Sequence, residues 1–284
     1  MNIIKSSRLA LFGYPLTYSL SPQIHKFFAD KCGIDLTYKL YAVPAAELLL
    51  KIEQFKQQGG IGFNVTTPYK HIMYQQLQDA THAAKIAQAV NTVKILADGS
   101  LYGENTDGDG LLLDLQKNRI PLKDQTILIL GAGGAVSGIL NDLITQQPAR
   151  IILVNRNSAK ACQLQAKYQC LTAIDVITYA EIAGVYSNVI INAVTQEAII
   201  AQWFYLQHIN FQDTYCYDLN YNFISSDFMR LALRKGARKS IGGLGMLVAQ
   251  AASGFNFWHG VYPDLTGILP HLQQYLRKNT INDL

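Results

Sequence analysis

Polar side chains are concentrated in two short segments at the ends of predicted strands in the first part of the chain. One segment is SLSP at residues 19–22, and the other is NVTTPYK at residues 64–70. Because side chains alternate along a strand, Asn64 and Thr66 face the same side of the chain. Ligands of open α/β sheets bind beyond the carboxyl ends of the strands, which is where both segments lie. Hydroxyls and an amide in that place suit a small molecule that is rich in hydroxyls or carries one carboxylate.

Each of these polar residues also has a structural interpretation. Ser21 precedes Pro22, a pattern typical of a helix N-cap followed by proline in the first turn. Asn64 is also a common turn residue, and Lys70 is also a typical solvated cation at the start of a helix. Taken one at a time, the structural and functional interpretations weigh about equally.

A glycine-rich turn, GAGGA at residues 131–135, follows the apolar stretch TILIL and precedes a predicted helix. Glycine lets the backbone turn tightly and lets a pyrophosphate approach, while a helix N-terminus offers free N–H groups and a partial positive charge. This context favours a dinucleotide-binding turn. Val136 stands where the third glycine of G-x-G-x-x-G is usual, so the helix packs differently there. The alternative is a turn that only joins a strand to a helix; it is not a P-loop, because no Gly-Lys-Ser/Thr follows.

The end of the next predicted strand bears on which dinucleotide binds. An NAD-binding fold usually carries an acidic residue there, which bonds the ribose 2′-hydroxyl. Here the strand ends in Asn155, Arg156 and Asn157, with Lys160 close behind and no carboxylate. Two cations attract a 2′-phosphate, and two charge-assisted bonds of roughly 1.5–3 kcal/mol each give a preference on the order of a hundredfold. We therefore predict NADP(H), against the alternative that both cations are solvated at a helix N-terminus, where cations are mildly unfavourable.

The elements that must position these residues alternate between strands and helices. Strands are predicted at residues 9–13, 36–43, 61–65, 126–130, 151–154, 189–192 and 215–218, with a hairpin around residues 98–99. The fold class is therefore α/β, with an N-terminal α/β substrate domain and a Rossmann-like doubly wound cofactor domain. Two helices follow the last predicted strand, at residues 244–260 and onward through residue 276, and we expect them to pack on the first domain.

Composition and charge exclude several classes of protein. The 284 residues make roughly two domains, and a hydrophobic fraction of 49% excludes disorder. A net charge of +4 is too small for an electrostatic nucleic-acid binder. No apolar run is long enough to span a membrane, and no signal-peptide cleavage pattern follows the N-terminus.

The cysteines and histidines complete this picture. The four cysteines form no C-x-x-C pair, which indicates reduced thiols in a cytoplasmic protein. The six histidines show no metal-binding spacing, so we expect no metal. We expect a small-molecule substrate and a monomer or homodimer, with no nucleic-acid or membrane partner.

Seven motifs, in order and at matching spacing, resemble those of shikimate dehydrogenases, and the resemblance covers nearly the whole chain. The motifs are GxPLxxSxSP at residues 13–22, NVTxPYK at 64–70, AVNT at 89–92, NTDG at 105–108, GAGGA at 131–135, NR at 155–156 and GLGMLVAQ at 243–250. The resemblance implies reversible, NADPH-dependent reduction of 3-dehydroshikimate to shikimate, a step of aromatic amino-acid biosynthesis. It implies a substrate-binding and catalytic domain at residues 1–106 plus 243–284, and an NADP-binding domain at residues 107–242.

The resemblance also implies roles for individual residues. Lys70 is similar to the family's catalytic acid/base, and Asp107 to its partner on the substrate hydroxyls. The implied substrate ligands are Ser19, Ser21, Asn64, Thr66, Asn91, Tyr221 and Gln250. The implied cofactor-binding residues are Gly131, Ala132, Gly133, Gly134, Ala135, Asn155, Arg156, Asn157, Lys160, Leu219 and Gly243.

The chemistry expected of the Lys70–Asp107 pair is proton transfer. Hydride delivery to a ketone carbon leaves charge on its oxygen, so a proton donor is needed within about 3 Å of that oxygen. Lys70 can donate, and a nearby Asp107 carboxylate would orient it and favour its charged form. Such acid–base help is worth roughly 10²–10⁴ in rate. The structural alternative for Asp107 is the N-cap of a helix starting at Gly108.

The sequence departs from the family pattern only on the cofactor side. Val194 replaces a common threonine, Gly242 a common aspartate and His82 a commonly acidic residue, while Asn157 and Lys160 replace a threonine and an arginine. Three rival functions are a quinate/shikimate dehydrogenase that uses NAD, a methyltransferase-like ribose binder and a non-catalytic ligand sensor. Arg156 and the lack of an acidic residue near position 155 argue against the first two, and the retained Lys70 and Asp107 argue against the third.

Overall fold

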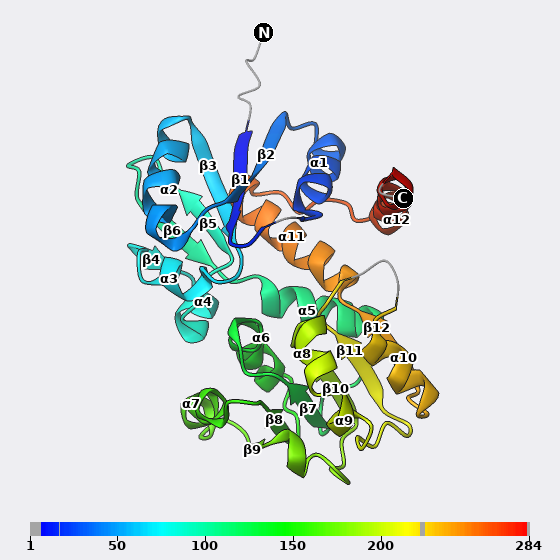
Figure 1. The fold of residues 1–284 in the computed structure, drawn as a ribbon. Helices are drawn as coiled ribbons and strands as arrows, with labels where there is room; N and C mark the ends of the chain where they lie inside the picture. The colour runs from blue at the N-terminus through cyan, green and yellow to red at the C-terminus, as the bar shows by residue number, and fades with distance from the viewer. Residues whose placement is uncertain (1–6, 17, 222–224, 283–284) are drawn as a thin grey trace. The chain divides into compact units, whose positions relative to one another are not determined.

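The structure, a computed structural model, describes residues 7–16, 18–221 and 225–282, with side chains through residue 276 (Figure 1). The chain folds into two compact units, one made of residues 1–110 and 248–284 and the other of residues 111–247. The chain passes between the units inside helix α5 (Asp107–Lys117) and again inside helix α11 (Leu244–His259). No described helix is both long and apolar enough to cross a lipid bilayer.

The first unit is built on a six-stranded mixed sheet with the order β2-β1-β3-β5-β6-β4. The strands are β1 (Ser7–Gly13), β2 (Leu36–Ala42), β3 (Gly60–Val65), β4 (Asp79–Ala80), β5 (Thr92–Ile95) and β6 (Leu101–Glu104). β1 runs parallel to β2 and β3, whereas β5 is antiparallel to β3 and β6. The β5–β6 hairpin turns at Asp98-Gly99, as predicted.

The helices that belong wholly to the first unit come from both ends of the chain. They are α1 (Ser21–Cys32), η1 (Ala45–Glu47), α2 (Leu48–Gln57), α3 (Lys70–Tyr74), α4 (His82–Ala87) and α12 (Ile268–Asn282). Trp258 of α11 lies against β3 at Gly62, where a Cβ would come within 2.3 Å of the indole nitrogen. That nitrogen donates to the Val93 carbonyl at 2.9 Å, so the C-terminal part of α11 packs directly on this sheet.

Two predicted helix caps in this unit are wrong. α1 begins at Ser21 itself, with Leu20 at the N-cap and no side-chain cap bond. α5 begins at Asp107, so Asp107 is its first residue rather than its cap. In both places proline or a neighbouring side chain organises the turn: Pro22 stands in the first turn of α1, and Asn105 Oδ1 accepts the Asp107 N–H at 3.1 Å.

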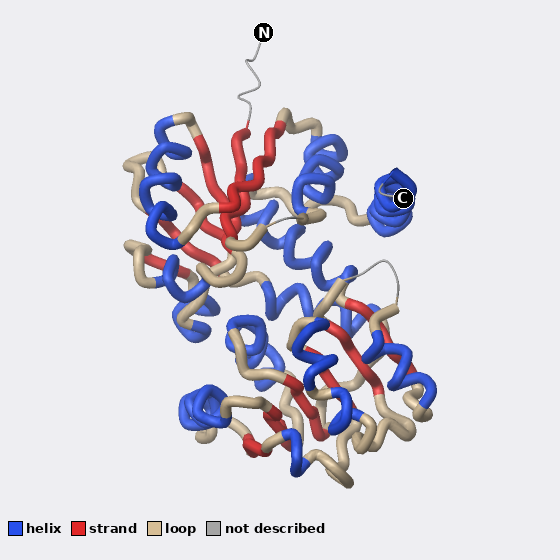
Figure 2. The backbone as a smooth tube through the Cα atoms, viewed as in Figure 1, coloured by secondary structure: helices blue, strands red, loops and turns tan. Residues whose placement is uncertain are grey.

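The second unit is built on a six-stranded parallel sheet with the order β12-β11-β10-β7-β8-β9. Its strands are red and the helices around them blue in Figure 2. Its strands are β7 (Thr126–Leu130), β8 (Arg150–Val154), β9 (Ile174–Ile177), β10 (Val189–Asn192), β11 (Tyr215–Asp218) and β12 (Lys239–Gly242). Its helices are α6 (Gly134–Thr145), α7 (Ser158–Tyr168), η2 (Tyr179–Glu181), α8 (Gln196–Ala201), α9 (Trp203–Leu206) and α10 (Asp227–Arg234). Chain order 3-2-1-4-5-6 across the sheet is that of a dinucleotide-binding fold, which confirms the predicted class.

The strand order of the second unit reverses between β7 and β10. In such sheets ligands bind beyond the carboxyl ends of the two strands at the reversal. The β7 end continues into the glycine turn, and the β10 end continues into Ala193 and Val194. The central strands are almost fully buried, with Ile127, Leu128 and Ile129 at 0% exposure, so the turn sits on a rigid support.

Candidate active site

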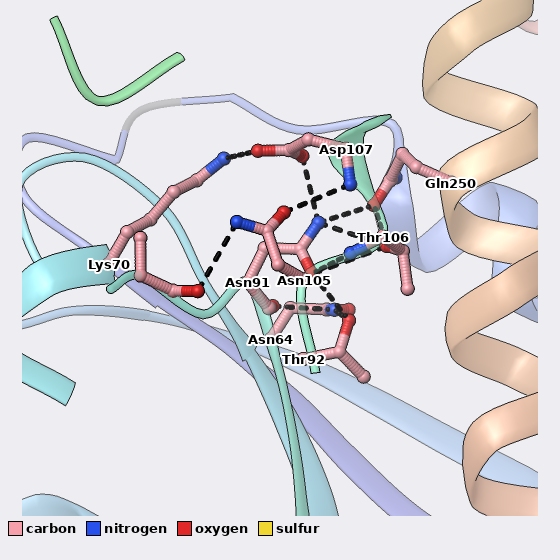
Figure 3. A network of polar contacts seen from close by, with 9 residues as sticks. Asn64, Lys70, Asn91, Thr92, Asn105, Thr106, Asp107 and Gln250 are labelled. Carbon is pink, nitrogen blue, oxygen red and sulfur yellow. Dashed lines mark hydrogen bonds and ion pairs between the residues drawn. The ribbon is translucent and has the colours of Figure 1, made fainter. Parts of the chain in front are cut away.

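The Lys70 ammonium forms an ion pair with Asp107 Oδ2 in the first unit (Figure 3). Lys70 opens α3 and Asp107 opens α5, so each side chain stands at the start of a helix. The side chains are only 17% and 9% exposed, respectively. A partly buried ammonium held by a carboxylate, with some access to solvent, is suited to exchanging a proton with a bound ligand.

The backbone around Lys70 is fixed by a turn that follows β3. The Tyr69 N–H donates to the Thr66 carbonyl at 2.8 Å, and the fully buried Tyr69 hydroxyl donates to the Val43 carbonyl. The Lys70 carbonyl in turn accepts from the Val90 N–H at 3.1 Å. These bonds tie Lys70 to the segment that contains Asn91 and leads into β5.

Asn91 holds the other oxygen of the Asp107 carboxylate. Its Nδ2 donates to Asp107 Oδ1 at 2.8 Å, and Thr106 Oγ1 and Gln250 Oε1 lie 3.0 and 3.3 Å from the same nitrogen. Its Oδ1 accepts the Thr106 N–H at 3.0 Å. Asn91 is 4% exposed, so this buried amide fixes the orientation of the carboxylate that holds Lys70.

The serine pair and Asn64 also lie in the first unit. The Ser19 hydroxyl is 3.1 Å from both the hydroxyl and the N–H of Ser21. Asn64 Nδ2 donates to the Asn91 carbonyl and to Thr92 Oγ1, both at 2.9 Å. The Asn64 side chain is thereby tied to the same network as Lys70 and Asp107, as Figure 3 shows.

Thr66 and Tyr221 complete the predicted substrate ligands. Thr66 is half-buried beside Gly13, where a Cβ would come within 2.5 Å of Thr66 Cγ2, so the first motif needs glycine at this position. Tyr221 belongs to the second unit, and burial raises the pKa of its phenol. Six of the seven predicted substrate ligands thus lie in the first unit together with Lys70 and Asp107.

Tyr38 is a member of this network that the sequence did not single out. Its hydroxyl donates to Asn64 Oδ1 at 2.6 Å and also contacts the Ser21 side chain. A tyrosine inside an alternating strand is usually interpreted as a packing residue, so the sequence contains no signal that would have identified it.

The glycine turn of the second unit fits a pyrophosphate. Gly131 has φ +118°, and its N–H donates to the Val154 carbonyl at 2.7 Å. A Cβ at Gly133 or Gly134 would meet no described atom within 4 Å, so the space outside the turn is open. Among the described residues, no side chain caps α6, whose first N–H groups are left for an anion.

The segment after β8 fits a phosphate on the ribose. Asn155 Nδ2 donates to the Asn157 carbonyl at 2.7 Å, and Asn157 Oδ1 caps α7 by accepting the Ala159 N–H at 3.0 Å. The two asparagines therefore shape the loop. Arg156 and Lys160 are exposed, and neither makes an ion pair within residues 7–16, 18–221 and 225–276, so their charges are available to an anion.

The remaining cofactor-side residues pack tightly around the ends of β10 and β11. The Leu219 N–H donates to the Asn192 carbonyl at 2.9 Å, and a Cβ at Gly243 would come within 2.5 Å of the Leu219 carbonyl oxygen. Glycine is therefore required at position 243. Val194 lies 3.0 Å from the place of a Cβ at Gly131, so this departure from the family pattern contacts the glycine turn itself.

The described part of the chain contains no candidate metal-binding site. No group of three or more histidine, cysteine, aspartate or glutamate side chains there is arranged to hold a metal ion. The four cysteines are unpaired, with Cys216 buried and Cys162 and Cys170 exposed.

Comparison with known proteins connects both units to one family. Residues 11–93 match the shikimate dehydrogenase substrate binding domain, residues 114–216 match shikimate/quinate 5-dehydrogenase, and residues 243–272 match the shikimate 5′-dehydrogenase C-terminal domain. The NADP(+) shikimate dehydrogenase of Aeromonas salmonicida is 37% identical, over 95% of this chain and 98% of that protein.

Solved structures of shikimate dehydrogenases are also similar to this chain. The shikimate dehydrogenase of Aquifex aeolicus is 29% identical, with a TM-score of 0.82 over 91% of this chain and 94% of that one. The enzyme of Thermus thermophilus, solved in complex with NADP(H) and shikimate, is 27% identical, with a TM-score of 0.77 over 91% of this chain and 95% of that one.

Proposed function

Because the chain belongs to the shikimate dehydrogenase family, we propose that it catalyses the reversible, NADPH-dependent reduction of 3-dehydroshikimate to shikimate. The observation that carries the proposal is the Lys70–Asp107 ion pair, held by Asn91 in the unit that matches the family's substrate-binding domain. Under this proposal the protein is an NADP-dependent oxidoreductase that acts on a CH–OH group.

The proposed role of Lys70 is to move one proton at the reacting oxygen. In the direction of reduction, the ammonium donates a proton to the carbonyl oxygen of the substrate, which becomes the hydroxyl of shikimate. NADPH, when bound, supplies the hydride that the carbonyl carbon accepts. In the direction of oxidation, the neutral amine takes the hydroxyl proton. Asp107 orients the amine through one oxygen, while Asn91 fixes the other oxygen.

The proposed substrate ligands carry hydroxyls and amides that suit a polyhydroxylated ring. They are Ser19, Ser21, Asn64, Thr66, Asn91, Tyr221 and Gln250. We assign substrate binding and catalysis to residues 1–106 plus 243–284, and NADP binding to residues 107–242. The support for the assignment is the pair of compact units and the separate family matches to each.

The proposed cofactor site uses the open glycine turn and two exposed cations, Arg156 and Lys160. Residues 131–135 would hold the pyrophosphate at the N-terminus of α6. Arg156 and Lys160 would hold the 2′-phosphate, with Asn155 and Asn157 shaping their loop. Leu219 and Gly243 would line the nicotinamide end.

A broader quinate/shikimate dehydrogenase is the second candidate, because residues 114–216 match a family described for both substrates. We favour shikimate with NADP because two cations, Arg156 and Lys160, stand where NAD binding calls for a carboxylate. We further propose a cytoplasmic location, supported by the four unpaired cysteines and by the biosynthetic reaction.

The test is oxidation of shikimate by the purified protein, followed by the absorbance of the reduced nicotinamide. Four arms combine shikimate or quinate with NADP or NAD. The proposal expects rapid reduction of NADP with shikimate and slow reduction in the other three arms. Equal rates with quinate and NAD would favour the broader enzyme, and no turnover in any arm would refute both.

A further inference from the structure

Asn64 is an amide whose orientation the hydrogen bonds determine. Its Nδ2 has two hydrogens, and they go to the Asn91 carbonyl and to Thr92 Oγ1. Since a backbone carbonyl can only accept, the nitrogen must lie on that side (Figure 3). The side chain is 8% exposed, so no water-facing alternative competes. Toward a ligand, this residue therefore presents its oxygen and can only accept.

The Asn64 oxygen is held by Tyr38. The Tyr38 hydroxyl donates to Asn64 Oδ1 at 2.6 Å, which leaves one lone pair of that oxygen for a ligand hydroxyl. Burial raises the pKa of this phenol, so it stays protonated and remains a donor. The same hydroxyl contacts Ser21, which is 3.1 Å from Ser19. One phenol thus joins the serine pair to the network that ends at Asp107.

The Tyr38 ring is held in place by aromatic packing. His25 of α1 stacks on it with ring centroids 4.7 Å apart and planes 8° from parallel. His25 is 1% exposed, and its pKa is lowered to about 3, mainly by burial, so the imidazole is neutral. The Trp258 ring of α11 also packs on the imidazole, with ring centroids 5.4 Å apart. The hydroxyl is therefore presented at a fixed position between Ser21 and Asn64.

We propose that Tyr38 is a positioning residue for the substrate site, which fixes the Asn64 amide with its oxygen toward the substrate and couples it to Ser21. This inference rests on the proposed function. It adds that the substrate hydroxyl nearest Asn64 acts as the donor. Tyr38 need not touch the substrate, because it acts through Asn64 and Ser21.

The experiment compares the wild-type protein with Tyr38→Phe, which keeps the ring and removes only the hydroxyl. The KM for shikimate should rise about three- to tenfold, the range for one neutral hydrogen bond. The value of kcat and the KM for NADP should stay within about twofold, because uniform substrate binding is lost rather than transition-state binding. The matched control is Tyr41→Phe, which alters a tyrosine of the same strand whose ring stacks on Phe12 instead.

A double-mutant cycle separates positioning from a general structural effect. In an Asn64→Ala background, Tyr38→Phe should change the shikimate KM by less than about twofold, because the bond it serves is already gone. Calorimetric titration with shikimate measures the same affinities without turnover. An active enzyme whose KM is unchanged by Tyr38→Phe, or changed equally in both backgrounds, overturns the inference alone. A wild-type protein that neither binds nor oxidises shikimate overturns the proposed function and this inference with it.

Discussion

Replacing Arg156 by alanine should weaken the preference for NADP over NAD. The guanidinium lies at the carboxyl end of β8, exposed, with no ion pair within the described side chains. The side chains of Asn155 and Asn157 form hydrogen bonds within the loop itself. Arg156 and Lys160 are therefore the cations of this segment that can bind a 2′-phosphate. A loss of preference on Arg156→Ala would then report one charge-assisted bond.

The size of the effect follows from the exposure of the guanidinium. A hydrogen bond to a charged group contributes about 1.5–3 kcal/mol, and an exposed one belongs at the lower end. We therefore expect about a tenfold drop in the ratio of kcat/KM values for NADP and NAD. Raising the salt to about 1 M should shrink the wild-type preference too, because the Debye length falls to about 3 Å.

The assay measures initial rates of shikimate oxidation with each dinucleotide at fixed ionic strength. Arg150→Ala is the matched control, since Arg150 opens the same strand at the opposite end and pairs with Asp175. The control should keep the wild-type ratio. A ratio for Arg156→Ala within about twofold of wild type would refute the assignment of Arg156 to the phosphate.

Two further predictions concern stability and the glycine turn. The pKa of His25 is lowered to about 3 in the folded protein, so the unfolded state binds the extra proton below its ordinary value of 6.5, and stability is lost as the pH falls through this range. The free energy of unfolding should drop by about 2 kcal/mol between pH 6.5 and pH 5 from this group. When that free energy is measured by chemical denaturation at several pH values, it should fall less steeply with pH in His25→Phe than in the wild type. An identical pH dependence in the two proteins would contradict the lowered pKa of His25. Gly131→Ala places a Cβ at φ +118°, 3.0 Å from Val194, and should cost about 1–3 kcal/mol with a weaker NADP affinity; an unchanged melting temperature would show that the turn can relax.

Much of the site could be anticipated because its residues follow strands. Residues 66–70 come directly after β3, whose last two residues are Asn64 and Val65, and the glycine turn comes directly after β7. Sheet geometry places such residues at the carboxyl edge, whatever the details of packing. The structure accordingly brings Lys70 and Asp107 together, although they are 37 residues apart.

The strands that the sequence did not predict are short and lie at sheet edges. β12 has the sequence KSIG and is half-buried along its length, β9 has IDVI, and β4 has only two residues. None presents the continuous apolar run of a central parallel strand, so periodicity alone gives no signal for them. Their pairing depends on neighbours that are distant in the chain.

Tyr38 was missed for a related reason. Its function depends on where its hydroxyl ends, across β1 from its own strand, at Asn64 on β3. No local sequence pattern predicts which strand lies two places away in a sheet. The two misplaced helix caps differ, since each was wrong by a single residue, where backbone geometry rather than residue type decides the boundary.

The most direct test of the account is turnover by Lys70→Ala. Loss of the proton donor should reduce kcat for shikimate oxidation about 10²–10⁴-fold, while calorimetry should still detect shikimate binding. Lys85→Ala, which alters an exposed lysine paired with Asp79 in the same unit, should turn over like wild type. Near-normal turnover by Lys70→Ala would show that another group moves the proton and would contradict the mechanism.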